Sequence, residues 1–554
     1  MDFRAILFDT RSIQNYIFSG NRLKTNIGAS YLVDRVFSDA LLPVIREALG
    51  EGELDDVTWR TVEDPDWSQM ETRARVGYIG GGNALILFRP DETEDTLRDI
   101  VARFTRHLLA AYPGLRTGAA IGILSLDAAG RMTSPHDLTA LVHQLKDEQN
   151  TVFPLVNVPY TGLTLSCEVN GEAAISYDRD EKRFFSAEVE AKLLADRKSD
   201  GHEAPAEAEL WRKLKSVLPT DKAASFLAGF AFPMEIGELG QRETEDYIAI
   251  VHIDGNNMGQ KFADCDTLTK RKNMSLSIRQ ATISAFTELL EKVEQEYDTY
   301  SSYLTLHMKD GKRFLPVRPL VLGGDDMTFV CAAKVAIPYA KFLMEALMEK
   351  HIPGCDGIAS CAGIAILPSS YPFFRGYEMA EQLCDAAKKR MRVLQEKRDC
   401  DSCWLDFAML HGEQAPTLEQ IRAEEYGGVL GNLHFGPYRV DVGDGQADSL
   451  AALLCGVREM RSGSHRMPRN KIKNCAAYSQ EVRTNSANSS RSSAIWDSRA
   501  RRCACRRSRP GSHMRSHSGI RVARRTSMSL SFSTTSQPRK ERNEHGKKEK
   551  DQPP

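Results

Sequence analysis

The sequence predicts an α/β protein that contains two copies of a βαββαβ unit. Each copy opens with an apolar strand that ends in an aspartate, Asp9 in the first copy and Asp254 in the second. A Gly-rich strand–turn–strand follows 73 residues after Asp9, at Gly82, and 71 residues after Asp254, at Asp325. An apolar strand closes each copy, GAAIGILSL in the first and SCAGIAIL in the second. The same order of elements at a near-constant offset indicates an internal duplication.

The local patterns support each element in turn. The first strands, AILFDT and YIAIVHID, are nearly continuous apolar runs, which are typical of buried strands. VGYIGGGNALILF (76–88) and LVLGGDDMTFV (320–330) are predicted hairpins, because their paired glycines permit a tight turn. The helix after SCAGIAIL has apolar residues at four-residue steps, which give it a buried face; these are Met379, Leu383, Ala387 and Met391.

The predicted units have the ferredoxin-like arrangement that polymerase and cyclase palm domains use. We expect a first, degenerate palm at residues 1–130, a mostly helical region at 131–240 and a second palm at 241–395. A C-terminal helical domain is predicted at 396–474, followed by a basic, disordered tail at 475–554. Because this fold hosts many functions, the site residues must decide the function.

The net charge of −2 hides an uneven distribution. The last 80 residues hold 18 Lys/Arg and 6 Asp/Glu, which leaves 55 basic and 69 acidic residues in the body, a net charge of −14. An acidic body disfavours a broad surface that grips the phosphates of long nucleic acids. It is compatible with small nucleotides that metal ions carry. In the tail, a nucleic-acid arm and disorder without function both remain open.

The chain has no run of eighteen apolar residues, and its N-terminus reads as a strand without a signal-peptide pattern. We therefore expect a cytoplasmic protein with no membrane contact. The twelve cysteines are scattered, which predicts free buried thiols rather than disulfides. Cys400 and Cys403 form one CxxC, but no second pair lies at zinc-finger spacing.

The second predicted hairpin carries the strongest chemical signal. Gly323 and Gly324 allow a triphosphate to approach the backbone, and Asp325 and Asp326 follow at the turn. In a ferredoxin-like sheet the first strand lies next to this hairpin, which brings Asp254 to the same edge. Carboxylates from two neighbouring strands suit two Mg²⁺ or Mn²⁺ ions. The alternative is a surface hairpin whose turn happens to read GGDD.

The corresponding positions of the first unit are Gly82 and Asn83, which cannot hold two metal ions in the same way. Gly80 and Gly81 are kept, so a nucleotide could lie against this hairpin. We therefore predict an inactive half that binds the second substrate or completes the site; simple structural duplication is the alternative. Lys388 is expected on the triphosphate, and a solvated basic face is its alternative interpretation.

The chain resembles the palm-containing large subunit of type III CRISPR effector complexes, the cyclic oligoadenylate synthetase family. The resemblance covers about residues 1–474. It is carried by SIQNYIF, LKTNIGASYLV and YIGGGNALILF in the first palm, by HIDGNNMGQKF, LVLGGDDMTFV and SCAGIAILPSSYPFFRGYEMAEQLCDAAKKR in the second, and by PYTGLTLSCEVNGEAA, LDFAMLHG, FGPYRV and MPRNKIKN elsewhere.

The resemblance implies that ATP binds between the two palms and that the GGDD hairpin forms phosphodiester bonds. Metal ligands would be Asp254 and Asp325, with Asp326 as a ligand or a support. Nucleotide contacts would come from Gly323, Gly324, Lys388, Gly81, Gly82, Asn83 and Ser30. Other effector subunits and guide or target RNA are the implied partners.

Two features differ from the family pattern. No helical nuclease domain precedes the first palm, and His136-Asp137 is a lone dipeptide that we interpret as a helix start, so we expect no cleavage of target DNA by this chain. The element between the palms holds Cys167 without a cysteine partner, so no zinc is expected.

These observations predict a metal-dependent nucleotidyltransferase that makes cyclic oligoadenylate-type signalling nucleotides from ATP in antiviral defence. In this reaction a ribose hydroxyl of one ATP attacks the α-phosphate of another and releases pyrophosphate. One alternative is a diguanylate-cyclase-like enzyme, which would use GTP. A second alternative is a non-catalytic scaffold subunit whose palms bind nucleotide or RNA.

Overall fold

The computed structural model describes residues 1–61, 65–133, 136–149, 162–179, 181–198, 203–241, 246–398, 401–411, 416–428, 431–432, 434–446, 448–462, 466–468 and 470–471. The predicted disordered tail at 475–554 lies outside these residues. Within them, no helix combines the length and apolarity needed to cross a membrane.

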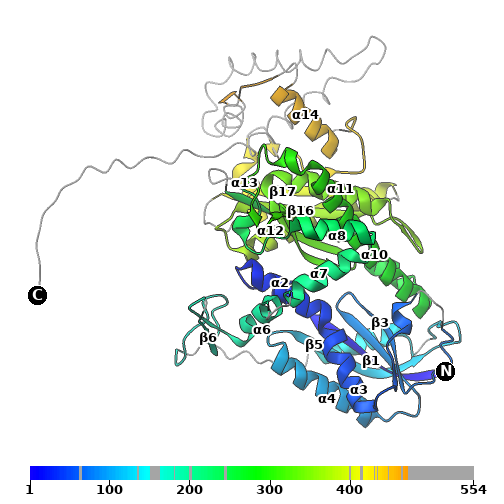
Figure 1. The fold of residues 1–554 in the computed structure, drawn as a ribbon. Helices are drawn as coiled ribbons and strands as arrows, with labels where there is room; N and C mark the ends of the chain where they lie inside the picture. The colour runs from blue at the N-terminus through cyan, green and yellow to red at the C-terminus, as the bar shows by residue number, and fades with distance from the viewer. Residues whose placement is uncertain are drawn as a thin grey trace, which may run out of the picture. The chain divides into compact units, whose positions relative to one another are not determined.

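The first sheet forms from residues 2–125, drawn in blue to cyan in Figure 1. Its strand order is β2-β3-β4-β1-β5. Its strands are β1 Asp2–Arg11, β2 Leu54–Asp55, β3 Ala74–Gly80, β4 Asn83–Phe88 and β5 Arg116–Ser125. Between β1 and β3 lie α1 Ile13–Phe18, α2 Leu23–Arg35, the π-helix Val36–Leu41, α3 Leu42–Leu49 and the short helix Thr58–Arg60; α4 Glu94–Ala111 connects β4 to β5.

The alternating side chains of β1 give this sheet two buried faces. On one face Phe8 packs edge-to-face on Phe104 of α4, with ring centroids 5.2 Å apart. On the other face Phe3, Ala5 and Leu7 share a core cluster with residues of α5, Leu138–Gln149. Asp137 accepts a hydrogen bond from the backbone amide of Ala140 at 3.0 Å, so the predicted helix start at His136-Asp137 is confirmed.

The second sheet has the order β12-β13-β9-β16-β17-β20. Its strands are β9 Tyr247–Gly255, β12 Val317–Gly323, β13 Asp326–Ala332, β16 Ser360–Pro368, β17 Trp404–Met409 and β20 Tyr438–Arg439. Its helices are α9 Met258–Ala263, α10 Leu268–Tyr300, the short helix Ala333–Val335, α11 Ala336–Met348 and α12 Phe373–Arg398. The four apolar residues predicted to form the buried face of α12 are all buried.

The two sheets repeat one topology, and this agrees with the predicted βαββαβ arrangement. β3-β4-β1-β5 in the first sheet corresponds to β12-β13-β9-β16 in the second, and every neighbouring pair is antiparallel. Asp9 pairs in register with Asn83, just as Asp254 pairs with Asp326. The equivalence that the spacings predicted therefore holds residue by residue at the hairpins.

One part of the predicted domain plan was wrong. Trp404–Met409 lies in the segment that we assigned to a C-terminal helical domain, but it forms strand β17 parallel to β16. Tyr438–Arg439 adds the next strand, β20. The apolar run WLDFAM is too short to distinguish a buried strand from a helix by periodicity, and pairing with the open edge of β16 decides the outcome. The helices of this segment are α13 Leu418–Glu425 and α14 Leu450–Ser462, and a two-stranded ladder joins β18 Gly427–Gly428 to β19 Gly431–Asn432.

The region between the palms is mostly helical, as predicted, with α6 Ala187–Asp196, α7 Pro205–Lys215 and α8 Thr220–Gly229. Its remaining elements are the hairpin β6 Ser176–Asp178 with β7 Arg183–Phe185, the strand β8 Phe230–Ala231 and the short helix Ile236–Glu238. Two small hairpins, β10 Met308–Lys309 with β11 Lys312–Phe314 and β14 His351–Ile352 with β15 Cys355–Asp356, belong to the second palm segment.

Seven cysteines in the described residues are free, and six of them are buried, as predicted. Cys167 packs in an apolar cluster with Phe185, Val189 and Leu193. The Sγ atom of Cys403 accepts a hydrogen bond from the backbone amide of Ser360 at 3.3 Å. Cys400, the other cysteine of the CxxC, lies outside the described residues.

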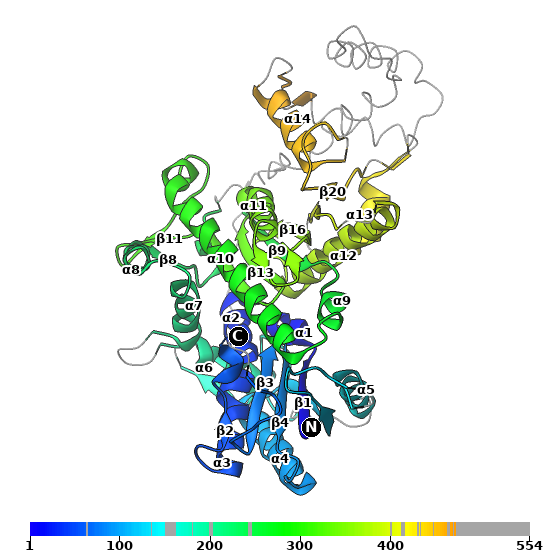
Figure 2. The ribbon, with the colours of Figure 1, turned by 90° about the vertical axis from the view of Figure 1, so that its right-hand side faces the viewer.

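Helix α10 connects the two palms. Figure 2 shows that α10 extends from beside the second sheet to the first. The N-terminal end of the helix is the end at the first palm. Near its start, Thr269 Oγ1 accepts a hydrogen bond from the buried Trp67 indole of the first palm at 2.8 Å. Arg279, further along, lies 3.3 Å from Asp34 of α2. These contacts fix the first palm against a helix that belongs to the second.

Candidate active site

The carboxylates of the second palm meet at one edge of the sheet. Asp254 is the penultimate residue of β9, Asp326 begins β13, and the two residues are direct cross-strand partners. Cross-strand partners point to the same face of a sheet, so both side chains lie on the face that α12 covers. Lys388 of α12 reaches this face and forms an ion pair with Asp254. Asp254 and Asp326 therefore meet at one edge as predicted, and Lys388 lies beside them; its contact with a triphosphate stays a prediction.

Asp325 occupies a different place from Asp326, because it lies in the turn. A Cβ atom added to Gly255 would stand 2.9 Å from the Cβ of Asp325, so the absence of a side chain at Gly255 gives Asp325 its place. The turn begins with Gly324 at φ +66°, and its carbonyl accepts a hydrogen bond from Thr282 of α10 at 2.6 Å. The two neighbouring acids therefore face different surroundings, in agreement with the prediction from the sequence.

The site raises the proton affinity of both hairpin acids. Burial, followed by the negative charge of Asp254, raises the pKa of Asp325 to about 6 and that of Asp326 to about 8. Burial alone would lower the pKa of Lys388, but the charge and the hydrogen bond of Asp254 outweigh it, so the pKa of Lys388 is raised. The site thus concentrates more negative charge than one lysine neutralises.

Behind Asp326 lies a group of residues that the sequence analysis missed. The Nδ1 atom of His252 lies 3.3 Å from Oδ1 of Asp326 and 3.1 Å from the hydroxyl of Thr328. Burial lowers the pKa of His252, which favours the neutral imidazole. Gln14 of the first palm donates a hydrogen bond from Nε2 to Oδ2 of Asp326 at 3.3 Å. The alternation of β9 could have identified His252, since it lies two residues before Asp254.

The acids suit a divalent cation, although no group of three or more His, Cys, Asp or Glu in the described ranges is arranged as a complete ligand set. Oδ1 of Asp326 is buried and accepts no hydrogen bond from the described residues. A buried carboxylate oxygen of this kind is a ready cation ligand. Mg²⁺ is commonly held by one or two carboxylates together with water and substrate phosphates. Asp254, Asp325 and Asp326 therefore fit Mg²⁺ or Mn²⁺ that arrives with a nucleotide.

The tips of both hairpins are open. A Cβ atom added to Gly323, Gly324 or Gly81 would meet no atom within 4 Å. In the first palm, Gly81 and Gly82 have φ values of +60° and +78°, which gives a turn with two left-handed residues. The amide of Asn83 donates to the carbonyl of Gly81 at 3.1 Å. The first hairpin therefore offers backbone and amide groups where the second offers acids.

The two hairpins lie along one face of α10. A Cβ atom added to Gly80 would stand 2.6 Å from the hydroxyl of Ser275, and Thr282 binds Gly324 seven residues further on. Seven residues of α-helix rise by about 10 Å, which is close to two turns. The predicted residues Gly81, Gly82 and Asn83 therefore lie near the acidic hairpin, as a composite site requires.

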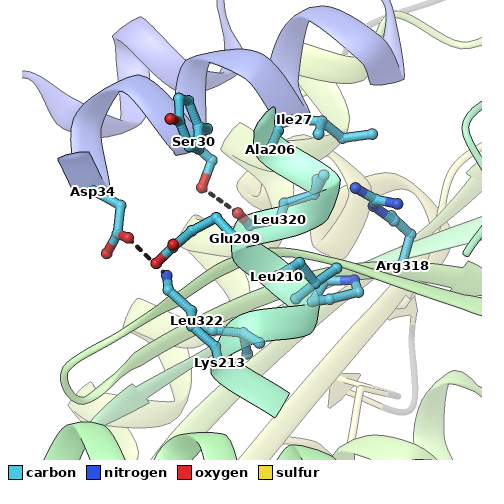
Figure 3. Close-up of a pocket in the computed structure, with 12 residues that line it drawn as sticks. Ile27, Ser30, Asp34, Ala206, Glu209, Leu210, Lys213, Arg318, Leu320 and Leu322 are labelled. Atoms are coloured by element: carbon cyan, nitrogen blue, oxygen red, sulfur yellow. Dashed lines mark hydrogen bonds and ion pairs between the residues drawn. The ribbon is translucent and has the colours of Figure 1, made fainter. Parts of the chain in front are cut away.

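Ser30 lies in a different setting. Its hydroxyl donates a hydrogen bond to the carbonyl of Leu320 in β12, in a cavity of about 50 Å³ (Figure 3). Lys213 and Asp34 form an ion pair at 3.0 Å in the wall of this cavity. Nucleotide-sized pockets are roughly 300–1,000 Å³, so this cavity is too small for ATP. Here Ser30 connects α2 to the second palm, and its contact with nucleotide stays a prediction.

A family model matches the part of the chain that carries this site. The family model described as "Cas10/Cmr2, second palm domain" matches residues 247–397. Among solved structures, a Csm1-Csm4 cassette in complex with cA4 is 13% identical with a TM-score of 0.43, and the match covers 96% of this chain and 69% of that chain. The apo Csm1-Csm4 cassette is 14% identical with a TM-score of 0.41, and the match covers 87% of this chain and 64% of that chain.

A Csm1-Csm4 subcomplex of the type III-A CRISPR-Csm interference complex is 13% identical with a TM-score of 0.38. No curated protein matches the chain. The family match spans β9 to α12, which contains the paired acids, the hairpin and Lys388. Residues 247–397 are therefore similar to the second palm domain of Cas10/Cmr2 proteins.

Proposed function

We propose that the chain is a metal-dependent nucleotidyltransferase that joins ATP molecules into cyclic oligoadenylate-type products in type III CRISPR defence. The observation that carries the proposal is the in-register pair Asp254 and Asp326, with Asp325 in the adjoining turn and Lys388 beside them. When bound, divalent cations would activate the attacking hydroxyl and stabilise the departing pyrophosphate. Other effector subunits and RNA are the partners that this proposal implies.

The residues of the chain would divide the work by position. Asp254, Asp325 and Asp326 would hold two divalent ions, and Lys388 would exchange its partner Asp254 for a phosphate oxygen. Gly323 and Gly324 leave open space in front of the hairpin, which allows a triphosphate to approach the backbone. In the reaction, a ribose oxygen of one ATP forms a bond to the α-phosphorus of another, and the bond to pyrophosphate breaks.

The first experiment is to incubate the chain with each NTP and Mg²⁺ or Mn²⁺ and to analyse the products by mass spectrometry. We expect oligoadenylates from ATP, with pyrophosphate released. The Asp325→Ala, Asp326→Ala double variant should make none, and its melting temperature should not fall, because the removal of repelling charges does not destabilise the fold. Wild-type product levels in the double variant, or GTP as the preferred substrate, would contradict this assignment.

A second experiment tests the composite site. We expect a non-hydrolysable ATP analogue to bind at two sites in the wild type. Gly81→Trp should abolish one of them, because Gly81 lies at an open hairpin tip with φ +60°. Gly81→Asn is the matched control, since asparagine tolerates left-handed backbone better than other side chains. A single site in the wild type would refute the composite site and favour a scaffold that binds one nucleotide.

A further inference from the structure

Gln14 belongs to the first palm, and its side chain contacts an acid of the second palm. It lies in the second position of α1, the short helix that directly follows β1. Its Nε2 atom donates to Oδ2 of Asp326 at 3.3 Å, although the two residues are 312 positions apart in the chain. Among the described residues, the other polar side chain close to this carboxylate is His252, whose Nδ1 lies 3.3 Å from Oδ1 and 3.1 Å from the hydroxyl of Thr328. The first palm thus supplies the one amide that holds Asp326.

Helix α1 is held firmly enough to place that amide. The ring of Phe18 stacks on Tyr377 of α12, with centroids 3.8 Å apart and planes inclined by 20°. At the same end of α1, Lys192 of α6 donates to the carbonyl of Tyr16 at 2.6 Å and to Ser19 Oγ at 3.0 Å. Lys192 is only 2% exposed, so these bonds are shielded from water. An α6 residue and an α12 residue therefore both fix the orientation of α1.

A comparison of the two palms shows that only the first has an amide side chain at this position. Ser12 lies three residues after Asp9, and Asn257 lies three residues after Asp254. Both have left-handed backbone, at φ +52° and +56°. Non-glycine residues in this conformation are uncommon and mark positions that the surrounding structure enforces. By this equivalence Gln14 corresponds to Gly259, which has no side chain and no atom within 4 Å of an added Cβ.

We propose that Gln14 is a positioning residue that fixes the carboxylate of Asp326, so that the first palm takes part in the chemistry of the second. This inference rests on the proposed nucleotidyl transfer. With Oδ2 held by Gln14, the buried Oδ1 keeps one orientation, toward the edge that it shares with Asp254. The first palm has lost its own acids but retains a structural role in the active site.

The test replaces Gln14 with methionine, which has nearly the same length and no donor. Asn15→Met is the matched control, because Asn15 is the next residue of α1 and is exposed. We expect Gln14→Met to lower kcat by about 10- to 100-fold, the usual effect of losing a hydrogen bond to a charged group. KM for ATP should stay within about threefold, because the amide is bonded to Asp326 and is not assigned a contact with the nucleotide.

Two further measurements separate positioning from folding. Titration with Mn²⁺ alone, followed by electron paramagnetic resonance, should show weaker binding in Gln14→Met and wild-type binding in Asn15→Met. Melting temperatures of both variants should lie within about 2 °C of the wild type. Gln14→Glu keeps the shape but replaces the donor with a charge, so it should not restore kcat.

An unchanged kcat and unchanged Mn²⁺ affinity in Gln14→Met would overturn the proposal. A loss shared equally by Asn15→Met, or one that accompanies a lower melting temperature, would assign Gln14 a merely structural role and overturn it as well. If the wild type makes no product from ATP, the proposed function fails, and the Mn²⁺ titration still decides the role of Gln14.

Discussion

Replacing the charge of Asp326 should stabilise the protein at alkaline pH. Burial, followed by the charge of Asp254, raises the pKa of Asp326 to about 8, so the folded chain resists the ionised form. Asp326→Asn keeps the shape of the side chain and can still accept the hydrogen bond from Gln14. The substitution therefore removes a destabilising charge and leaves the described contacts in place.

The sign and size of the effect follow from linkage. Between pH 4 and pH 8 the unfolded chain releases the proton of Asp326 while the folded chain retains it, so wild-type stability falls as the pH rises through this window. A shift from 3.8 to about 8 corresponds to a ceiling of about 6 kcal/mol. Because 26% of the side chain is exposed and water can relax around it, we expect about 1–3 kcal/mol.

The assay is thermal unfolding in EDTA at pH 5 and pH 8. Asp326→Asn should melt about 2–6 °C above the wild type at pH 8 and show a smaller gain at pH 5. Asp298→Asn, an exposed acid of α10, is the control and should show no such difference. Added Mg²⁺ should narrow the gap at pH 8 by stabilising the wild type. An equal gain at both pH values would refute the reasoning.

Three other substitutions test separate contacts. Lys388→Met leaves the charge of Asp254 uncompensated, so it should lower the melting temperature at pH 8 in EDTA. Added Mg²⁺ should restore the melting temperature. An unchanged melting temperature in EDTA would contradict a stabilising ion pair. Gly28→Ala would place Cβ 1.8 Å from the carbonyl of Lys192, so it should cost about 1–3 kcal/mol, whereas Gly229→Ala, in open space, should cost little. Gly82→Asp should also melt earlier, because its φ is +78°, and it should create no second Mn²⁺ site by paramagnetic titration.

Local patterns in the sequence predicted the parts of the site that neighbouring residues determine. Asp254 at a strand end and the hairpin with Asp325 and Asp326 follow from apolar runs and glycine pairs, and the constant spacing predicted their register. Gln14 could not be predicted in this way, because its partner lies 312 residues away and only the packing of α1 brings them together. Ser30 shows the same limit, since its partner depends on how α2 meets β12.

The C-terminal boundary failed for a related reason. The run at Trp404–Met409 carries no periodicity that separates strand from helix, and its state depends on the vacant edge of β16. The different turns of the two hairpins also escaped prediction. Gly82 takes a left-handed backbone, and Asp325, at the equivalent position, is not among the described residues with positive φ. The glycine in the first palm therefore reflects a turn that an acid would strain.

Helix α10 sets the spacing between the hairpins of the two palms. Ser275 lies under the first hairpin and Thr282 binds the second, so the helical repeat determines their separation. Inserting one residue between these positions would turn one contact by about 100° away from the other and lengthen the interval by about 1.5 Å. The sequences of the two hairpins can therefore diverge, as GGGN and GGDD have done. The length of the helical segment from Ser275 to Thr282 is constrained, because it sets the space between the hairpins.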